Sequence, residues 1–235
     1  FVINWGVSIY NLLAYRKRYG GKYKLYRKLY LEREGISLAH LKKIQSDEYR
    51  KLVEHAISHS LFYQRLYKSF SFDIGDIKNI TKLPIVTKED LRLNINDVYT
   101  ISQKKAAIGK TGGTTGKSLV VRNTLDNAQE RFALLDNFRA KQGYKLGKKT
   151  AWFSGKKILN KRDLHRHQFW KTDYIYKVRY YSTFHIATKN LSFYLDNLLS
   201  YAPEYIVGFP SSIYDIAKEG LRLDKRFDKG VVKAI

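Results

Sequence analysis

The chain has few or none of several residue types, and each absence narrows what it can be. None of its 235 residues is cysteine, so disulfides, thiolate metal sites and a cysteine nucleophile are excluded. This composition suits a reducing compartment, and we expect a cytoplasmic protein. No run of roughly 18 or more apolar residues occurs, so the sequence predicts no membrane-spanning helix.

Methionine is also absent, and the first residue is Phe1. Because translation starts at methionine, we expect that residues precede Phe1 in the natural protein. The last residues, "VVKAI", predict a short apolar strand with nothing after it. We therefore expect the chain to be a fragment at both ends.

Acidic side chains are scarce: 21 stand against 44 lysines and arginines, for a net charge of +23. Residues 1–30 carry seven basic side chains and no acidic one, and residues 141–180 carry twelve against two. Such an imbalance favours anionic partners, namely nucleotides, acidic lipid headgroups or nucleic acid. A solvated lysine-rich surface would have the same composition.

Hydrophobic periodicity predicts a helical first part and an α/β second part. Residues 1–100 are mostly helical in pattern, with one or two amphipathic helices over 41–69 and a helix capped by Thr87. Gly20–Gly21 divides residues 1–30 into two short helices. Beyond about residue 105, strands alternate with helices, which predicts an α/β fold with a mainly parallel sheet and flanking helices. The strands are expected at 118–122, 149–155, 174–182 and 203–209, and the helices at 124–143, 188–201 and 210–220.

The stretch "IGKTGGTTGKSLVVR", residues 108–122, is the strongest candidate for phosphate binding. A Walker A loop would need glycine where Thr111 stands and would lead into a helix, whereas this loop leads into an apolar strand. The sequence instead predicts a turn between two strands whose amide groups form an anion-binding nest. Hydroxyl groups and one lysine would add donors. These residues are Thr111, Gly112, Gly113, Thr114, Thr115, Gly116, Lys117 and Ser118.

The segment "TGGTTGKS" resembles the signature loop of the adenylate-forming (AMP-binding) superfamily. It matches from Thr111 to Lys117 and departs at Ser118, where proline is usual. With "LVEHAISHSLFYQRLY", "LPIVTKEDLR", "GYKLGKKTAWFSG" and "YIVGFPSSIYDIA", the chain resembles the CapK-like branch of the phenylacetate–coenzyme A ligase relatives. That branch is associated with capsular polysaccharide biosynthesis, and the resemblance covers nearly the whole chain.

The resemblance implies a ligase reaction in which a carboxylate attacks the α-phosphate of ATP. An acyl-adenylate and pyrophosphate form, and the acyl group then passes to coenzyme A or another acceptor. Residues Thr111 to Lys117 would hold the ATP phosphates, with Mg²⁺ sharing that work. The resemblance also implies that residues 1–235 are an incomplete N-terminal adenylation domain, in which 1–100 are mostly helical and 101–235 form the α/β core. We expect this chain alone, without the family's C-terminal domain, to have negligible adenylation activity.

Phe184 and His185 follow a predicted strand and are similar to an aromatic–histidine pair that lines the acyl pocket in this family. Ligands of open α/β sheets collect at the carboxyl ends of strands. Gly208, in "GFPSS", is a further candidate for that pocket. For the histidine, a purely structural hydrogen bond is an equally good interpretation, and for "GFPSS" a structural turn is the better one.

Two pairs of histidines have spacings seen in metal sites, but the residues around them do not favour metal binding. His165 and His167 lie two residues apart without a convincing third ligand. His55 and His59 are one helical turn apart, but Ala56 replaces the glutamate of a zincin motif. We expect no metal at either pair.

A different class of function is a non-catalytic basic module. The segment "YNLLAYRKRYGGKYKLYRKLY" interleaves tyrosine with lysine and arginine, as single-strand nucleic-acid binders do. The same alternation suits a helix at the surface of an anionic membrane. Because no recognised nucleic-acid module is present, nucleic acid is the less favoured partner, and peripheral membrane contact stays open.

Overall fold

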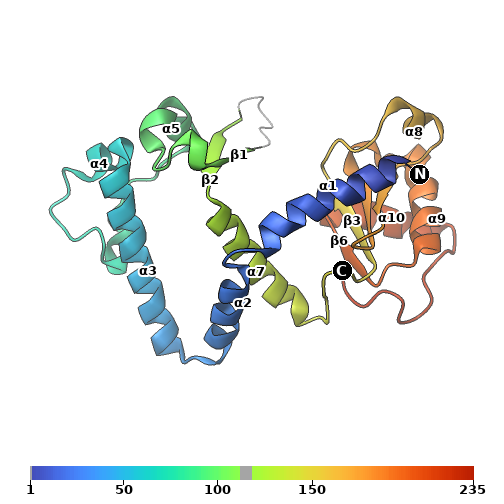
Figure 1. Ribbon diagram of the computed structural model, residues 1–235, viewed down its shortest axis with the longest axis horizontal. Helices are drawn as coiled ribbons and strands as arrows, with labels where there is room; N and C mark the ends of the chain where they lie inside the picture. The colour runs from blue at the N-terminus through green and yellow to red at the C-terminus, as the bar shows by residue number, and fades with distance from the viewer. Residues whose placement is uncertain (1, 112–117) are drawn as a thin grey trace. The chain divides into compact units, whose positions relative to one another are not determined.

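The computed structural model describes residues 2–111 and 118–235, which form two compact units (Figure 1). Unit 1 comprises Phe1–Gly20 and Leu135–Ile235, and unit 2 comprises Gly21–Leu134. Among the described residues, no helix combines the length and the hydrophobicity needed to cross a membrane.

Unit 2 is mainly helical, as predicted. Of the one or two helices expected over 41–69, two are present, because Ser60 adopts an extended conformation (φ −122°, ψ 114°) and its side chain accepts a hydrogen bond from Tyr63 N. The predicted cap at Thr87 is confirmed, and Asp90 completes a capping box with it. The elements are α2 (Tyr23–Glu32), η1 (Arg33–Gly35), α3 (Leu38–His59), α4 (Leu61–Tyr67), η2 (Ile77–Lys82), α5 (Lys88–Leu93), α6 (Ile95–Val98) and η3 (Gln103–Lys105).

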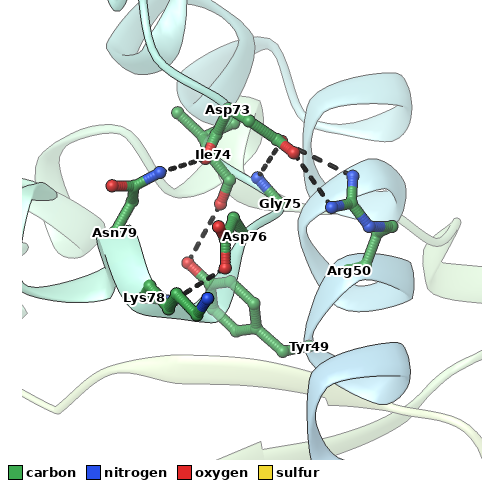
Figure 2. A network of polar contacts seen from close by, with 8 residues as sticks. All are labelled: Tyr49, Arg50, Asp73, Ile74, Gly75, Asp76, Lys78 and Asn79. Atoms are coloured by element: carbon green, nitrogen blue, oxygen red, sulfur yellow. Dashed lines mark hydrogen bonds and ion pairs between the residues drawn. The ribbon is translucent and has the colours of Figure 1, made fainter. Parts of the chain in front are cut away.

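The segment between α4 and η2 is tied to α3 by a polar network (Figure 2). The Tyr49 hydroxyl donates to the Ile74 carbonyl (3.1 Å), and Arg50 Nη2 donates to Asp73 Oδ2 (2.9 Å). Asp73 Oδ1 also accepts from Gly75 N. The Arg50 hydrogen bond lowers the pKa of the Asp73 carboxyl. These bonds hold an otherwise irregular stretch against a long helix.

A hairpin follows the helices of unit 2. Strands β1 (Ala107–Lys110) and β2 (Val120–Asn123) are antiparallel. Helix α7 (Leu125–Ala140) begins where Asn127 N donates to the Thr124 side chain, which confirms that predicted cap. It ends before Gly143, whose φ of +76° is a left-handed conformation that glycine favours.

Unit 1 contains a four-stranded sheet in the order β4-β5-β3-β6. Strands β3 (Thr150–Ser154), β5 (Val178–Ser182) and β6 (Tyr205–Val207) are parallel, and β4 (Trp170–Asp173) pairs antiparallel with β5. The strand predicted over 174–182 begins only at Val178, because Tyr174–Lys177 form the turn from β4. The strand expected at 231–235 is limited to a parallel bridge between Tyr205 and Ala234. A helical first part and a mainly parallel sheet are thus confirmed.

Helices cover this sheet and complete its core. The elements are α1 (Val2–Tyr19), α8 (Lys161–His165), η4 (Thr183–His185), η5 (Thr188–Asn190), α9 (Leu191–Tyr201) and α10 (Pro210–Arg222). Helix α1 lies against β4 and ends before Gly20–Gly21, as predicted. The buried core gathers side chains of the strands, α9 and α10, namely Ala151, Phe153, Phe169, Tyr181, Tyr194, Leu195, Leu198, Ile206 and Ile216.

Candidate functional site

The β1–β2 hairpin of unit 2 presents the predicted phosphate loop. Thr111 N donates to the Leu119 carbonyl, and Leu119 N donates to Thr111 Oγ1, each at 2.9 Å. The loop therefore joins two strands, which confirms the rejection of a Walker A loop. Because a hydroxyl can accept and donate together, Thr111 keeps a proton for a further partner. Of the other candidates, Gly112, Gly113, Thr114, Thr115, Gly116 and Lys117 lie outside the described residues.

The preceding segment anchors this hairpin. The Tyr99 hydroxyl donates to the Val120 carbonyl (3.0 Å), and Arg122 Nη1 donates to the Ile101 carbonyl (2.8 Å). The Arg122 guanidinium also lies 3.6 Å from the centre of the Tyr99 ring, within cation–π range. The strand that follows the loop, β2, is thus fixed at two positions to the same short stretch of chain.

The other candidates, Phe184, His185 and Gly208, lie in unit 1 at the carboxyl edge of the parallel strands. η4, which contains Phe184 and His185, directly follows β5, and Gly208 directly follows β6. A Cβ built on Gly155, after β3, would lie 3.9 Å from both Thr183 Oγ1 and Phe209 Cε2. The three strand ends therefore converge, as the rule for open α/β sheets leads one to expect.

Phe184 and His185 line a cavity of about 350 Å³ at this edge. Its other lining residues are Lys157, Ile158, Leu159 and Ser182. Phe184 is 59% exposed, so its ring forms part of the cavity wall rather than of the core. The cavity combines an apolar wall with one lysine and one histidine.

The His185 ring is held in place by its neighbours. Ser182 Oγ lies 2.9 Å from His185 Nδ1, and the Asn190 amide donates to the His185 carbonyl (2.8 Å). The Phe169 ring stacks on the imidazole with centroids 6.0 Å apart. The Tyr194 hydroxyl donates to the Ser182 carbonyl (2.6 Å), and burial raises the pKa of that hydroxyl, so it stays protonated. When the Ser182 hydroxyl donates to Nδ1, the neutral imidazole carries its proton on Nε2.

Gly208 lines a different cavity, of about 620 Å³, among residues that include Phe138, Arg139, Tyr205 and Tyr214. A Cβ at Gly208 would lie only 2.5 Å from Phe153 Cβ. Glycine therefore allows the end of β6 to approach β3. The structure brings Gly208 to the same sheet edge as Phe184 and His185 but not into their cavity.

The sequence did not single out Ser182 or the residues Lys157–Leu159 that follow β3. Their positions could have indicated them, because Ser182 ends one predicted parallel strand and Lys157–Leu159 come shortly after another. Ser182 is 1% exposed and ends β5. Its role as partner of the His185 ring depends on the η4 turn.

Of the two histidine pairs, three members, His55, His59 and His167, stack on another ring. The His167 and Phe193 rings stack with centroids 4.3 Å apart, and the His55 and His59 rings stack at 4.4 Å. Across residues 2–111 and 118–235, no group of three or more His, Cys, Asp or Glu side chains could hold a metal ion. The described residues therefore do not by themselves offer a Mg²⁺ cage.

Comparison with known proteins places this chain beside CapK of Staphylococcus aureus. The two are 28% identical over 217 residues, which is 92% of this chain and 47% of CapK. The chain thus spans about half the length of that relative. No family model matches the chain.

Three solved structures of 2-hydroxyisobutyryl-CoA ligase share the fold, each over 81% of this chain. An open conformation with 2-HIB-AMP and CoA has a TM-score of 0.57 at 13% identity and 45% coverage of that enzyme. The thioesterification state, with the same ligands, gives 0.55 at 16% identity, and the postadenylation state with 2-HIB-AMP gives 0.56 at 14%, each over 41% of that enzyme. The chain is a homologue of CapK and has part of the fold of the acyl-CoA ligases of the adenylate-forming superfamily.

Proposed function

We propose that the natural gene product containing this chain activates a carboxylate with ATP as an acyl-adenylate and then transfers the acyl group. The observation that carries the proposal is the hairpin closed between Thr111 and Leu119, which presents the sequence T-G-G-T-T-G-K between two strands. The 2-hydroxyisobutyryl-CoA ligase structures, which hold an acyl-AMP and CoA, support it at the level of fold.

In this proposal the loop binds the phosphates that leave as pyrophosphate. Negative charge builds up on those oxygens as the carboxylate attacks the α-phosphate. Glycine amides can aim directly at them, and Lys117 adds a point charge. Donors already aligned for the developing charge stabilise the transition state more than the ground state.

The carboxylate substrate would occupy the cavity lined by Phe184 and His185. Its volume of about 350 Å³ is near the lower end of ordinary ligand cavities, which suits a small acyl group. Phe184 supplies an apolar wall. His185 can donate from Nε2 when Ser182 satisfies Nδ1, and Lys157 offers a positive charge to a carboxylate.

Magnesium would reach such a site bound to ATP. Mg²⁺ in nucleotide sites keeps several waters and binds mainly phosphate oxygens, so the lack of a carboxylate cage among the described residues is compatible with its use.

The relatives support a proposal for the acceptor and for the biological setting. Because 2-hydroxyisobutyryl-CoA ligase was solved with CoA, we propose CoA or another acceptor for the second step. The likeness to CapK suggests a role in cell-surface polysaccharide biosynthesis.

The experiment is pyrophosphate release from ATP by the natural gene product, screened over a panel of small carboxylic acids. We expect release with at least one acid. Lys117→Ala should lower kcat/KM about a hundredfold, the usual size of effect for losing one transition-state donor. Lys105→Ala, in the exposed η3 turn of the same unit, is the matched control and should stay near the wild-type rate. The proposal fails if no acid supports release, or if both lysine variants behave alike.

A further inference from the structure

The side of α1 (Val2–Tyr19) that faces the sheet is polar. Its contacting residues recur every three or four positions, so they share one helix face. Ser8, Asn11 and Tyr15 are 0%, 8% and 4% exposed. Two backbone amides donate to this face: Thr172 N to Asn4 Oδ1 (3.2 Å) and Tyr174 N to Ser8 Oγ (2.9 Å). In turn, Asn11 Nδ2 donates to Asp173 Oδ2 (2.7 Å), and the Tyr15 and Tyr180 hydroxyls are hydrogen-bonded to each other (3.1 Å).

The position of β4 explains this polar face. β4 is an edge strand of the sheet, so its outward amides have no strand to pair with. Asn4 and Ser8 accept hydrogen bonds from amides two positions apart along this edge, and Asn11 bonds the carboxylate of the fully buried Asp173. Polar groups are thus needed here to satisfy buried backbone and charge.

The opposite face of α1, the α1 outer face, is apolar and exposed. Its side chains are Ile9, Tyr10 and Leu13, with exposures of 55%, 69% and 57%. Trp5 and Leu12, at 44% and 37% exposed, lie at the border of this face, where the Trp5 and Tyr174 ring centroids are 5.8 Å apart. An ordinary surface helix has the reverse arrangement, with its apolar stripe on the core. The contacts of unit 1 therefore explain the inner face of α1 and its border with Tyr174, whereas Ile9, Tyr10 and Leu13 lie away from the sheet and stay exposed.

Basic residues follow on the same helix. Arg16 and Lys17 lie in its last turn and are exposed. No acidic residue occurs in residues 1–30, so this stretch as a whole carries a net positive charge. Tryptophan and tyrosine beside leucine, isoleucine and basic side chains is the composition of helices that lie in the headgroup region of a bilayer.

The partner must satisfy both halves of this surface. Nucleic acid could bind the basic residues in the last turn of α1, but it has no apolar surface against which Ile9 and Leu13 could pack. A purely apolar protein partner would cover those two residues but would not complement the net positive charge of residues 1–30. An anionic bilayer provides phosphate charge and hydrocarbon within a few ångströms of each other.

We propose that the α1 outer face docks in the plane of a membrane that contains anionic lipids, with Ile9 and Leu13 entering the acyl boundary and Arg16 and Lys17 at the phosphates. Unit 1 would thereby be held at the surface without spanning it. The proposal does not depend on the ligase activity, because it uses none of the residues assigned to that site.

The test is co-sedimentation of the natural gene product with vesicles of phosphatidylcholine alone or of an equimolar mixture with phosphatidylglycerol. We expect partition onto the anionic vesicles, weakened by added salt, with a blue shift of fluorescence that Trp5→Phe removes. Ile9→Ser with Leu13→Ser should weaken the partition about tenfold or more. Arg16→Gln with Lys17→Gln should weaken it about tenfold on the anionic vesicles and little on neutral ones.

Matched control variants distinguish binding through the α1 outer face from non-specific hydrophobic adsorption and from the effect of overall charge. Ile85→Ser removes an apolar side chain that is 91% exposed elsewhere, and Lys145→Gln with Lys229→Gln removes the same charge from other exposed sites. Both should bind vesicles like the wild type. The proposal is overturned if the wild type ignores anionic vesicles, or if it binds single-stranded RNA in their place. It is also overturned if the Ile9 and Leu13 changes lower thermal stability without weakening vesicle binding, since another part of the protein would then cover the face.

Discussion

Replacing Gly208 by alanine tests the closeness of the two strands whose ends form the candidate site. Gly208 follows β6, and the last pair of the β3–β6 ladder is Trp152 with Val207, so Gly208 lies beside Phe153. The new Cβ would be 2.5 Å from Phe153 Cβ and 3.3 Å from its Cα. Carbon atoms in contact are normally about 3.5–4.0 Å apart, so one strand end must move by about 1 Å.

The surroundings leave little room for that movement. Phe153 is 1% exposed and stacks on Tyr181 with ring centroids 4.8 Å apart. Inserting a methyl group into a well-packed core costs roughly 1–3 kcal/mol, and the contact with a backbone-linked atom argues for the upper half of that range. We expect Gly208→Ala to lower the free energy of unfolding by about 2–3 kcal/mol, which is roughly 4–12 °C in Tm for a chain of this size.

Urea unfolding followed by circular dichroism measures the effect, and two further variants sharpen it. Gly6→Ala, in α1, has no atom within 4 Å of the new Cβ and should be neutral or stabilising by up to about 1 kcal/mol. Phe153→Leu keeps the Cβ that causes the clash, so it should not rescue Gly208→Ala. If Gly208→Ala costs no more than Gly6→Ala, or if Phe153→Leu restores stability, the close approach of β6 to β3 is refuted.

Substitutions at three further features of unit 1 give additional tests. In the wild type, Lys171 Nζ lies 2.6 Å from the buried Asp163 carboxylate. Lys171→Met leaves that carboxylate without its ion-pair partner and should lower the free energy of unfolding in urea by about 3–5 kcal/mol. The double variant Lys171→Met with Asp163→Asn, which also removes the charge of Asp163, should lower it less. Burial raises the pKa of Tyr201 from 10.0 to about 12, so the unfolded chain loses this proton first as the pH rises, and stability should fall between those pH values. In Tyr201→Phe, unfolding curves over that range should show a shallower fall. Ser182→Ala removes the partner of the His185 ring and should raise KM for the carboxylate several-fold in the pyrophosphate assay, with a smaller change in kcat.

Most of the regular elements could be predicted from local signals. Helices α9 and α10 have clear 3.6-residue periodicity, and α5 and α7 begin at capping side chains, Thr87 and Thr124, that are visible in the sequence. The apolar runs that became β3 and β6 are short and bounded, as parallel strands are. These features depend on residues within about one turn of each other, so no tertiary information was needed.

The candidate site was only partly predictable. The place of the phosphate loop between two strands followed from "SLVV", and the position of Phe184 and His185 followed from the end of a predicted strand. Gly208 was a candidate for the same acyl pocket, but it lines a different cavity from Phe184 and His185. That distinction depends on the β3–β6 register, which no local pattern reveals.

Strand β4 and the orientation of α1 show where local reasoning fails. The segment Trp170–Asp173 contains a buried lysine and a fully buried aspartate, so its hydropathy does not indicate a strand. It is stable because Lys171 pairs with Asp163, and because Asp173 is bonded by Asn11, 162 positions away in sequence. The same distant bond turns the polar face of α1 inward, although its apolar residues alone would predict the opposite. A helix that forms polar contacts with an edge strand must place its apolar residues outside, and this inversion is the physical reason to seek the partner of α1 outside the core of unit 1.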